Sequence, residues 1–448
     1  MSTPDGTTVQ DYFHSIADAI QPLLQGGEIY TSSFHGEESD FVRFNRGAVR
    51  QAGAVMQRSL GIDLVEGGRH AAGTLTLSGD LHADRARLAR LIGELREIRA
   101  QLAEDPYLLY ATAVRSTEHR RSAALPDGAS AVAAIRAAGD GRDLVGIYAA
   151  GASHAGFSNS FGQRNWYTAP SFNLDWSFFH DADKAVKASY AGTTWDAAQL
   201  ARKVETAAEQ LSALAHPARR LTPGRYRVYL APAALQELLG ILSWGGFGLR
   251  AHRTKTSPLI KMVEEGVRLH PSVRVLENTA DGIAPGFQSA GFVRPDRVVL
   301  IDEGSYRDCL VSPRSAAEYG VETNGASAGE APASIEVGGG SIPTDRVLGE
   351  LGTGLYVSNL WYLNFSDRSA CRATGMTRFA TFWVEHGQIQ APVEVMRFDE
   401  TIYRMLGENL AGLTAERELI LDPGSYFQRS TDSARLPGVL VDDFTLTL

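Results

Sequence analysis

Residues 48–79 read AVRQAGAVMQRSLGIDLVEGGRHAAGTLTLSG, and this stretch decides the fold of the first half of the chain. Apolar and polar residues alternate along it, and a glycine pair interrupts the alternation. A period of two is that of a β-strand with one buried face, and glycines between such runs indicate turns. The preceding runs EIYTSSF and DFVRFNRG show the same pattern. We therefore predict an antiparallel meander with one face in solvent.

Helical periodicity marks other segments of the first half. In TTVQDYFHSIADAIQPLL, Phe13, Ile16, Ile20 and Leu24 recur at helical spacing behind a threonine cap. The runs ADRARLARLIGELREIRAQL, ASAVAAIRAAG and DAAQLARKVETAAEQLSAL predict three more helices, and DLVGIYAAGASHAGFSNSFGQRNWYTAPSFNLDWSFFH predicts further strands. The polar, proline-containing stretch AHPARRLTPG near residue 220 lacks periodicity, as expected of a domain boundary.

The second half begins with residues 225–259, RYRVYLAPAALQELLGILSWGGFGLRAHRTKTSPL, which predict a strand, a turn, an amphipathic helix and a basic loop. Strand-rich runs follow, among them DRVVLIDEGSYRDCLVS, TGLYVSNLWYLNF and FATFWVEHGQIQAPVEVMRF, and VETNGASAGEAPAS predicts an exposed loop. The overall prediction is an α+β protein. A helix-plus-antiparallel-sheet domain would span residues 1–220, and a β-rich domain residues 221–448.

The composition limits the partners and the location of the chain. Its 448 residues are enough for two domains, and 44% apolar with 21% charged residues is a globular composition. A net charge of -9 argues against nucleic acid or an anionic membrane as the main partner, because both require a basic surface. We expect a cytoplasmic protein, since neither a signal-peptide pattern nor a membrane-spanning run is present. Two distant cysteines, Cys309 and Cys371, exclude a disulfide scaffold, and Cys309 is predicted to face inward from a strand.

The residues by themselves offer no complete catalytic set. The 11 histidines include no HxxxH, HExxH or HxH spacing. The densest group of potential metal ligands is His35, Glu37, Glu38 and Asp40 in FHGEESD, for which a solvated turn before a strand is the better interpretation. Cys371 has arginine neighbours in DRSACRATG, which favour a thiolate, but no histidine partner is evident. An ordinary loop cysteine is therefore the better interpretation there.

The second half carries three segments in a characteristic order: RVVLIDEGSYRDCLVSPRSAAEYGVETNG, then SIEVGGGSIPTDRVLGELGTGLYVSNLW, then RATGMTRFATFWVEHGQIQAPVEVMRFDETIYRMLGENL. In this order they resemble the TldD/PmbA family of metallopeptidase-related proteins, formerly called modulators of DNA gyrase. In the first half, ESDFVRFNRGAVRQAGAVMQRSLGIDLVEGGRHAAGTLT resembles the opening meander of that family. The resemblance covers nearly the whole chain and rests on the collinear order of the segments.

The sequence departs from the family pattern at its metal site. Metal-bearing, TldD-type members carry HExxxH on the first helix of the second domain and a cysteine near the C-terminus. This sequence has ALQELLGILSW there, with Gln236 and Glu237 at the degenerate metal-helix position and His252 only in the loop beyond. The stretch PGSYFQRSTDSARLPGVLVDDFTLTL contains no cysteine. The resemblance is therefore to TldE/PmbA, and it implies no catalytic residue, no metal and no cofactor in this subunit.

A TldE-like chain is expected to pair with a TldD-type, zinc-bearing subunit in a heterodimeric peptidase whose chamber holds unfolded or short peptides. A peptide could add to the strand GTGLYVSNLW, although core or interface packing of its aromatic residues is the alternative. A stand-alone hydrolase that uses Cys371 or FHGEESD, and a homodimeric scaffold without proteolysis, stay open as other hypotheses. The candidate peptide-binding residues are Gly352, Gly354, Tyr356, Asn359 and Trp361.

Overall fold

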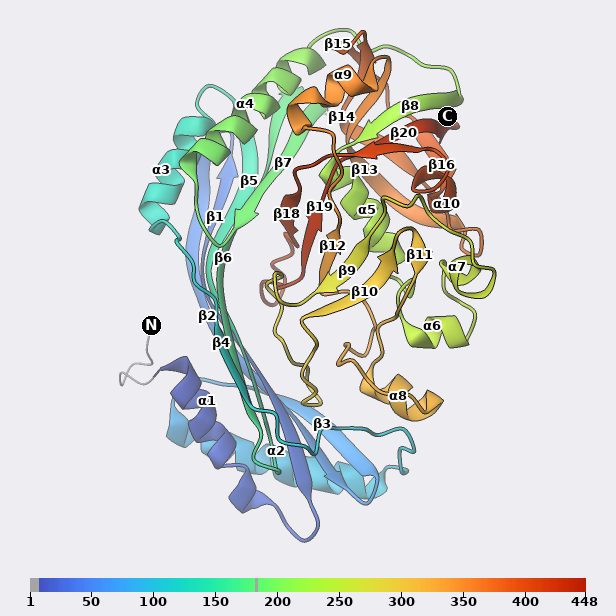
Figure 1. Ribbon diagram of the computed structural model, residues 1–448. Coiled ribbons are helices and arrows are strands. Elements are labelled where there is room, and N and C mark those ends of the chain that lie inside the picture. The colour runs from blue at the N-terminus through green and yellow to red at the C-terminus, as the bar shows by residue number, and fades with distance from the viewer. Residues whose placement is uncertain (1–7, 182–183) are drawn as a thin grey trace.

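A long, curved sheet forms the first half of the computed structural model, which describes residues 8–181 and 184–448 (Figure 1). The predicted start of the first domain, residues 1–7, lies outside the described residues. The strand order is β3-β2-β1-β5-β6, and β4 and β7 pair with separate stretches of β6. The strands are β1 (Ile29–Asn45), β2 (Ala48–Glu66), β3 (Arg69–Thr76), β4 (Thr117–Arg120), β5 (Asp143–Asn159), β6 (Arg164–Asp181) and β7 (Lys184–Gly192).

Tight turns connect the first three strands. Arg46 and Gly47, with φ of 52° and 68°, join β1 to β2, and Gly67 and Gly68, with φ of 58° and 78°, join β2 to β3. Two-residue turns with positive φ match the right-handed twist of paired strands. Both strand pairs are antiparallel, so the predicted meander is confirmed.

Four helices pack against this sheet at its two ends (Figure 1). The apolar stripes of α1 (Val9–Asp18) and α2 (Leu81–Gln101) share one hydrophobic cluster with β1, β2 and β3. The stripes of α3 (Gly128–Ala138) and α4 (Ala197–Leu214) share a second cluster with β5, β6 and β7. Each helix begins at a side chain that accepts a hydrogen bond from the first turn, which explains the four predicted starts. These caps are Thr8, Asp80, Asp127 and Asp196.

The second half contains a closed ring of five strands. The first, β8 (Gly224–Leu230), lies between β13 (Gly354–Asp367) and β20 (Val439–Leu446). The ring closes because β20 pairs with β16 (Arg397–Thr401), β16 with β14 (Arg372–Glu385), and β14 with β13. Its side chains belong to the largest hydrophobic cluster, together with those of α5 and of the neighbouring sheet. The remaining elements on this sheet are β15 (Gln388–Pro392) and β17 (Leu410–Leu413).

A six-stranded sheet lies beside the ring, in the order β11-β10-β9-β12-β19-β18. The predicted α+β class is confirmed. The division into two domains at residue 220 stays a prediction; β8, the first strand of the second half, begins four residues later. None of the helices in residues 8–181 and 184–448 has the length and apolar character needed to cross a bilayer. The strands are β9 (Val275–Asn278), β10 (Arg297–Asp302), β11 (Ser305–Tyr306), β12 (Ser334–Val337), β18 (Glu418–Leu421) and β19 (Ser433–Leu436). The helices are α5 (Pro232–Leu242), α6 (Leu249–Arg253), α7 (Ile260–Glu264), α8 (Pro313–Tyr319), α9 (Val347–Leu351) and α10 (Ile402–Met405), and 3-10 turns span Gln21–Leu23 and Thr344–Arg346.

Candidate functional site: polar cavities between the two halves

The face of the long sheet that meets the second half is polar along β1. Side chains of a strand alternate between its faces, so Thr31, Ser33, His35 and Glu37 lie on one face. Phe34 lies on the other face, in the cluster under α1. On neighbouring β5 and β6, the corresponding face carries a small apolar cluster that contacts Phe287 of the second half. The two halves therefore meet over the polar side of β1, and two cavities lie there.

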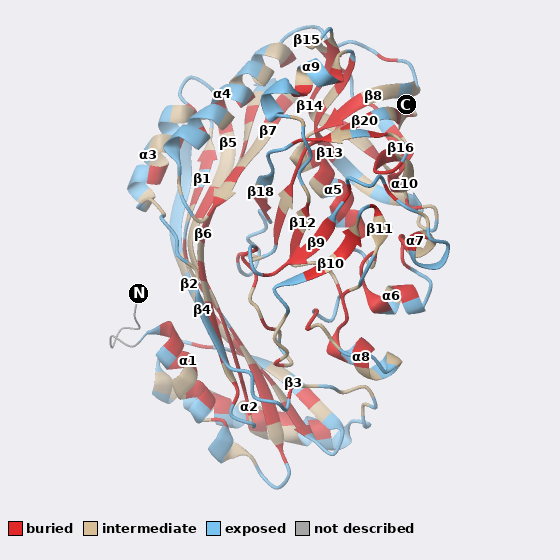
Figure 2. Ribbon diagram, viewed as in Figure 1, coloured by how far each residue is buried: buried red, intermediate tan, exposed pale blue. Residues whose placement is uncertain are grey.

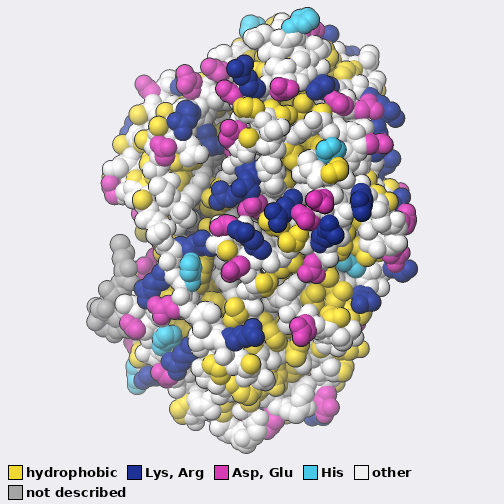
Figure 3. Space-filling view, in the orientation of Figure 1, with side chains coloured by type: hydrophobic (Ala, Val, Ile, Leu, Met, Phe, Trp, Pro, Cys, Tyr) yellow, Lys and Arg dark blue, Asp and Glu magenta, His cyan; other side chains and the backbone are white. Residues whose placement is uncertain are grey.

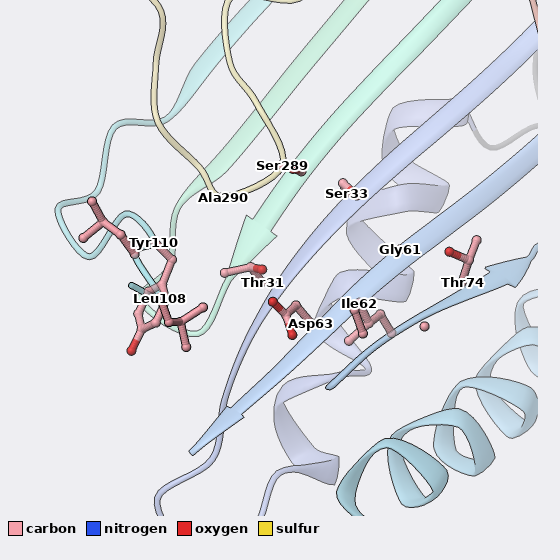
Figure 4. A pocket seen from close by; sticks show the side chains of 13 residues that line it. Thr31, Ser33, Gly61, Ile62, Asp63, Thr74, Leu108, Tyr110, Ser289 and Ala290 are labelled. Carbon is pink, nitrogen blue, oxygen red and sulfur yellow. The ribbon is translucent and has the colours of Figure 1, made fainter. Parts of the chain in front are cut away.

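The Ser33 cavity has a volume of about 340 Å³ and lies at the α2 end of the sheet (Figure 4). Its walls come from β1, β2 and β3, from the segment after α2, and from the loop that carries Ser289 and Ala290. Asp63 on its wall accepts a hydrogen bond from Nδ1 of His70 at 3.0 Å. The labelled lining residues are Thr31, Ser33, Gly61, Ile62, Asp63, Thr74, Leu108, Tyr110, Ser289 and Ala290.

The Glu37 cavity continues along β1 and has a volume of about 380 Å³. It shares Ser289 with the Ser33 cavity. Three loops of the second half close it, and the small-residue loop that we predicted to be exposed is one of them. Its polar lining residues include His35, Glu37, Ser153, Tyr167, Gln288, Ser289, Arg294, Ser327, Gln428, Arg429, Ser430, Thr431 and Asp432.

Glu37 is the most deeply buried acid of this cavity, with 2% of the residue exposed. Its Oε2 accepts hydrogen bonds from Nε2 of Gln57 at 2.8 Å and from the backbone N–H of Arg429 at 3.1 Å. Its Oε1 has no hydrogen-bond partner within the described residues. His35 lies two residues away on the same face; it is exposed, and partial desolvation of its ring lowers its pKa.

The Arg429 side chain connects the loop between β18 and β19 to the long sheet. Its guanidinium donates to Oγ of Ser39 at 3.2 Å, and to the backbone oxygen and Oγ of Ser171 at 3.1 and 2.8 Å. It also donates to the backbone oxygen of Gly151 at 3.4 Å. Burial lowers the pKa of Arg429, and the charge of Glu37 acts in the opposite direction. The contacts join strands β1, β5 and β6 to a loop between β18 and β19.

The opposite wall carries a second group of charges. Burial lowers the pKa of Arg294, while Glu277 and Asp432 raise it. Asp432 is exposed, but partial desolvation and the charge of Asp422 raise its pKa, and Arg294 lowers it. No ion pair within 4.0 Å joins Arg294 to either acid among the described residues. Arg294 donates from Nε to the backbone oxygen of Gly325 at 3.1 Å. Charged side chains of both signs cover the middle of the face seen in Figure 3.

The structure separates the four acidic and histidine residues that the sequence grouped in FHGEESD. His35 and Glu37 line the cavity, while Glu38 and Asp40 lie on the opposite face of β1. Glu38 contacts Arg58 at 3.4 Å, and Asp40 lies beside the start of α3. No group of three or more His, Cys, Asp or Glu side chains that could hold a metal ion occurs in the part of the chain that the structure describes.

Helix α5 presents no metal-binding set. Gln236 is half-buried and Glu237 is exposed, and an HExxxH pattern placed on them would end at Ile241, which is 4% exposed in the main core. Glu237 is exposed, but partial desolvation by the residues around it raises its pKa, and Lys187 of β7 lowers it. His252 is buried and its ring contacts the backbone oxygen of Gly246 at 2.9 Å and the Tyr306 hydroxyl. The residues at this position therefore do not fit a zinc ion, which prefers imidazole and thiolate donors.

The candidate peptide-binding residues lie on β13 and just before it. Between Leu355 and Val357, β13 pairs with β8 on one edge and β14 on the other, so an added strand has no free edge there. The Tyr356 ring packs against Tyr229 and Phe382, and its hydroxyl accepts from Nε2 of Gln210 at 3.2 Å. Beyond Val357, Asn359 is buried and Trp361 is 41% exposed under Arg378. A role of Gly352, Gly354, Tyr356, Asn359 and Trp361 in peptide binding stays a prediction.

Neither cysteine has the environment of a nucleophile. Cys371 is 0% exposed, and burial raises its pKa to about 12 despite the charge of Arg368. Burial raises the pKa of Cys309 to about 11, and the charges of Asp308 and Glu330 add to this effect. Cys309 is partly exposed and lies after β11, so the prediction that it faces inward from a strand was wrong. Both thiols are protonated at pH 7, which disfavours the stand-alone hydrolase with Cys371 as nucleophile.

Sequence reasoning missed Arg294, Arg429 and Asp432. All three lie in or beside loops, where no periodicity marks a residue as buried. The one available signal for the cavity was the alternation in FHGEESD, which places His35 and Glu37 on the same face of a strand.

Comparisons with known proteins agree with this architecture. Residues 223–448 match the model of the PmbA/TldA metallopeptidase C-terminal domain. This chain belongs to the PmbA/TldD metallopeptidase family. The protein named "Metalloprotease PmbA" of Escherichia coli O157:H7 is 27% identical over 259 residues, which cover 54% of each chain. The chain thus spans about half the length of the curated relative that it matches.

Solved structures show that the fold of this PmbA/TldD family member extends over the whole chain. TldE from Thermococcus kodakarensis superposes with a TM-score of 0.77 at 12% identity, covering 98% of this chain and 100% of that one. A putative modulator of a DNA gyrase from Thermotoga maritima gives 0.74 at 13% identity, with coverage of 98% and 100%. A putative modulator of DNA gyrase from Bacteroides thetaiotaomicron gives 0.72 at 15% identity, with both chains fully covered. The expected TldE-like fold is confirmed.

Proposed function

We propose that this chain is the subunit without a metal site in a heterodimeric TldD/TldE-type peptidase. The observation that carries the proposal is the composition of α5. In a family named for metallopeptidases, this helix has Gln236, Glu237 and buried Ile241 where an HExxxH motif would place its three defining residues. Zinc and the water-activating chemistry of proteolysis would then belong to a TldD-type partner, and this chain would complete a chamber for unfolded or short peptides.

An open strand edge supports a protein partner. Residues 48–57 of β2 pair with β1 on one edge and, among the described residues, with no strand on the other, since β3 and the residue after it pair only from Arg58 onward. Both faces of residues 48–54 are exposed (Figure 2), and Val49 and Met56 are exposed apolar side chains. An unpaired edge accepts a strand from another chain through main-chain hydrogen bonds.

The test is co-expression of this chain with a TldD-type subunit from the same genome. We expect co-elution in size-exclusion chromatography, stoichiometric zinc in the complex, and cleavage of unfolded casein by the complex only. Stoichiometric zinc with protease activity in this chain alone would refute the proposal. Exclusive formation of a homodimer, with no co-elution, would instead support the scaffold hypothesis, for which the same open edge of β2 is available.

A surface variant makes the test specific. Lysine side chains protect natural strand edges against pairing, so Ala54→Lys with Met56→Lys should abolish co-elution while circular dichroism stays unchanged. Both residues are exposed on β2. Ala100→Lys, at an exposed position of α2, is the matched control and should co-elute like the wild type. If both variants co-elute with the partner equally well, the open edge of β2 is not part of the interface.

A further inference from the structure

The Glu37 cavity contains polar atoms that the protein itself leaves without partners. Oε1 of Glu37 and Nε2 of Gln288 are buried and make no hydrogen bond within residues 8–181 and 184–448. Both residues line the cavity. An unpaired buried polar atom costs about 1–3 kcal/mol, and these two lie on facing sides of the cavity, Glu37 on β1 and Gln288 on a loop of the second half. These atoms indicate a ligand.

The unpartnered atoms include both acceptors and donors. Glu37 provides a carboxylate oxygen, and Asp432 adds a second, exposed carboxylate on the opposite wall. Gln288 provides a buried amide N–H, and Arg294, whose Nε donates to the backbone oxygen of Gly325, adds a guanidinium to the lining. A purely cationic ligand would leave Gln288 and Arg294 unpaired, and a purely anionic one would leave Glu37 unpaired. A ligand with charges of both signs satisfies all of them.

The size and position of the cavity restrict the ligand further. A volume of about 380 Å³ lies at the lower end of the range of about 300–1,000 Å³ that is usual for small-molecule sites. The cavity lies between the long sheet and three loops of the second half, and no residue of α5 lines it. The guanidinium of Arg429 is excluded as a contact, because its hydrogen bonds to Ser39, Gly151 and Ser171 hold it against the sheet.

We propose that the Glu37 cavity binds a small zwitterion, a free amino acid or a dipeptide, with its ammonium group at Glu37 and Asp432 and its carboxylate at Arg294. The inference rests on the proposed function only in the choice of a peptide-derived zwitterion. Ligand binding is measured on the isolated chain and partner assembly by co-elution, so either proposal can fail while the other stands.

The experiment is isothermal titration calorimetry of the isolated full chain with alanine, glycine, alanyl-alanine and glycyl-glycine. Binding of at least one of them is expected at one site per chain. The N-acetylated and the C-amidated forms of the best ligand should each bind about 10–100-fold more weakly, the usual effect of losing one charged hydrogen bond. Absence of binding by all four compounds, or equal binding of the capped forms, would overturn the proposal.

Two variants assign the contacts. Glu37→Gln keeps an oxygen that can accept from Gln57 and Arg429, so the fold is preserved while the charge is lost. It should weaken binding about 10-fold or more, as should Arg294→Gln. Asp40→Asn, an exposed change on the opposite face of β1, should bind like the wild type. If Asp40→Asn weakens binding as much as Glu37→Gln, or if neither cavity variant changes it, the assignment is wrong.

Discussion

The backbone N–H of Arg429 donates a hydrogen bond to the carboxylate of Glu37 at 3.1 Å, and this contact joins a loop between β18 and β19 to β1. The side chain of Arg429 continues past Glu37 to Ser39, Gly151 and Ser171 on three strands. One loop residue therefore connects three strands of the long sheet to the second half beside the Glu37 cavity.

Replacement of Arg429 by methionine should destabilise the protein. The change keeps most of the side-chain volume but leaves buried acceptors on β1, β5 and β6 without a donor, at a cost of roughly 2–4 kcal/mol. Urea unfolding followed by tryptophan fluorescence measures the difference. Arg346→Met, at an exposed position, is the control and should change the free energy of unfolding by less than about 0.5 kcal/mol. Equal effects of the two substitutions would contradict the role assigned to Arg429.

Glu28 should make stability fall in acid. Burial alone would raise its pKa, but hydrogen bonds from Arg96, the backbone of Gln25 and Arg99 lower it from the ordinary value of 4.5 to about 2. The unfolded chain therefore binds the proton first. The stabilisation, roughly 2–3 kcal/mol, is complete well above pH 4.5 and disappears as the pH falls towards 2.

Thermal unfolding of the wild type and Glu28→Gln tests this pH dependence. The variant should melt at a lower temperature at pH 7, and the difference should shrink steadily from pH 5 to pH 3. Glu97→Gln, an exposed change on α2, should follow the wild type at every pH. A difference between wild type and Glu28→Gln that stays constant with pH would show that the ion pairs with Arg96 and Arg99 do not cause it.

Gly354→Ala should disrupt the contact between β13 and β8. A Cβ at this position would lie 2.2 Å from the backbone oxygen of Arg227, and backbone cannot move aside as a flexible side chain can. A loss of about 1–3 kcal/mol is expected in urea unfolding. Gly349→Ala, in α9 with nothing within 4 Å of its Cβ, should instead stabilise the protein by about 0.5–1 kcal/mol. If Gly354→Ala leaves the free energy of unfolding unchanged, the close approach to Arg227 is not the reason for this glycine, and a role in the approach of a bound peptide becomes the alternative.

Cys371 should be unreactive in the folded protein. With the pKa raised to about 12 and no exposure, its thiol is neither ionised nor accessible at pH 8. Iodoacetamide labelling followed by mass spectrometry should modify Cys309 slowly and Cys371 only after unfolding in guanidinium. Rapid alkylation of Cys371 in the native protein would restore it as a candidate nucleophile.

Local patterns in the sequence were enough to predict the strands of the first half, its four helices and the threonine cap of the first helix. The alternation around Gly67–Gly68 follows from burial on one face, and the Thr8 side chain accepts a hydrogen bond from the first turn of α1. The Glu37 cavity could be predicted only in part. His35 and Glu37 share a face by period, but Arg294 and Asp432 reach them through tertiary contacts between loops, which leave no periodic signal in the sequence.

The ring of five strands has a consequence for biosynthesis. Strand β8 is made early in the second half, yet both of its neighbours, β13 and β20, are made much later. Until they emerge, the apolar side chains of Val228 and Leu230, both 0% exposed in the folded protein, have no partner strands. Non-local pairing of this kind is slow and prone to aggregation. The nascent second half should therefore depend on chaperones, while the sequential hairpin of β1 and β2 can form as it leaves the ribosome.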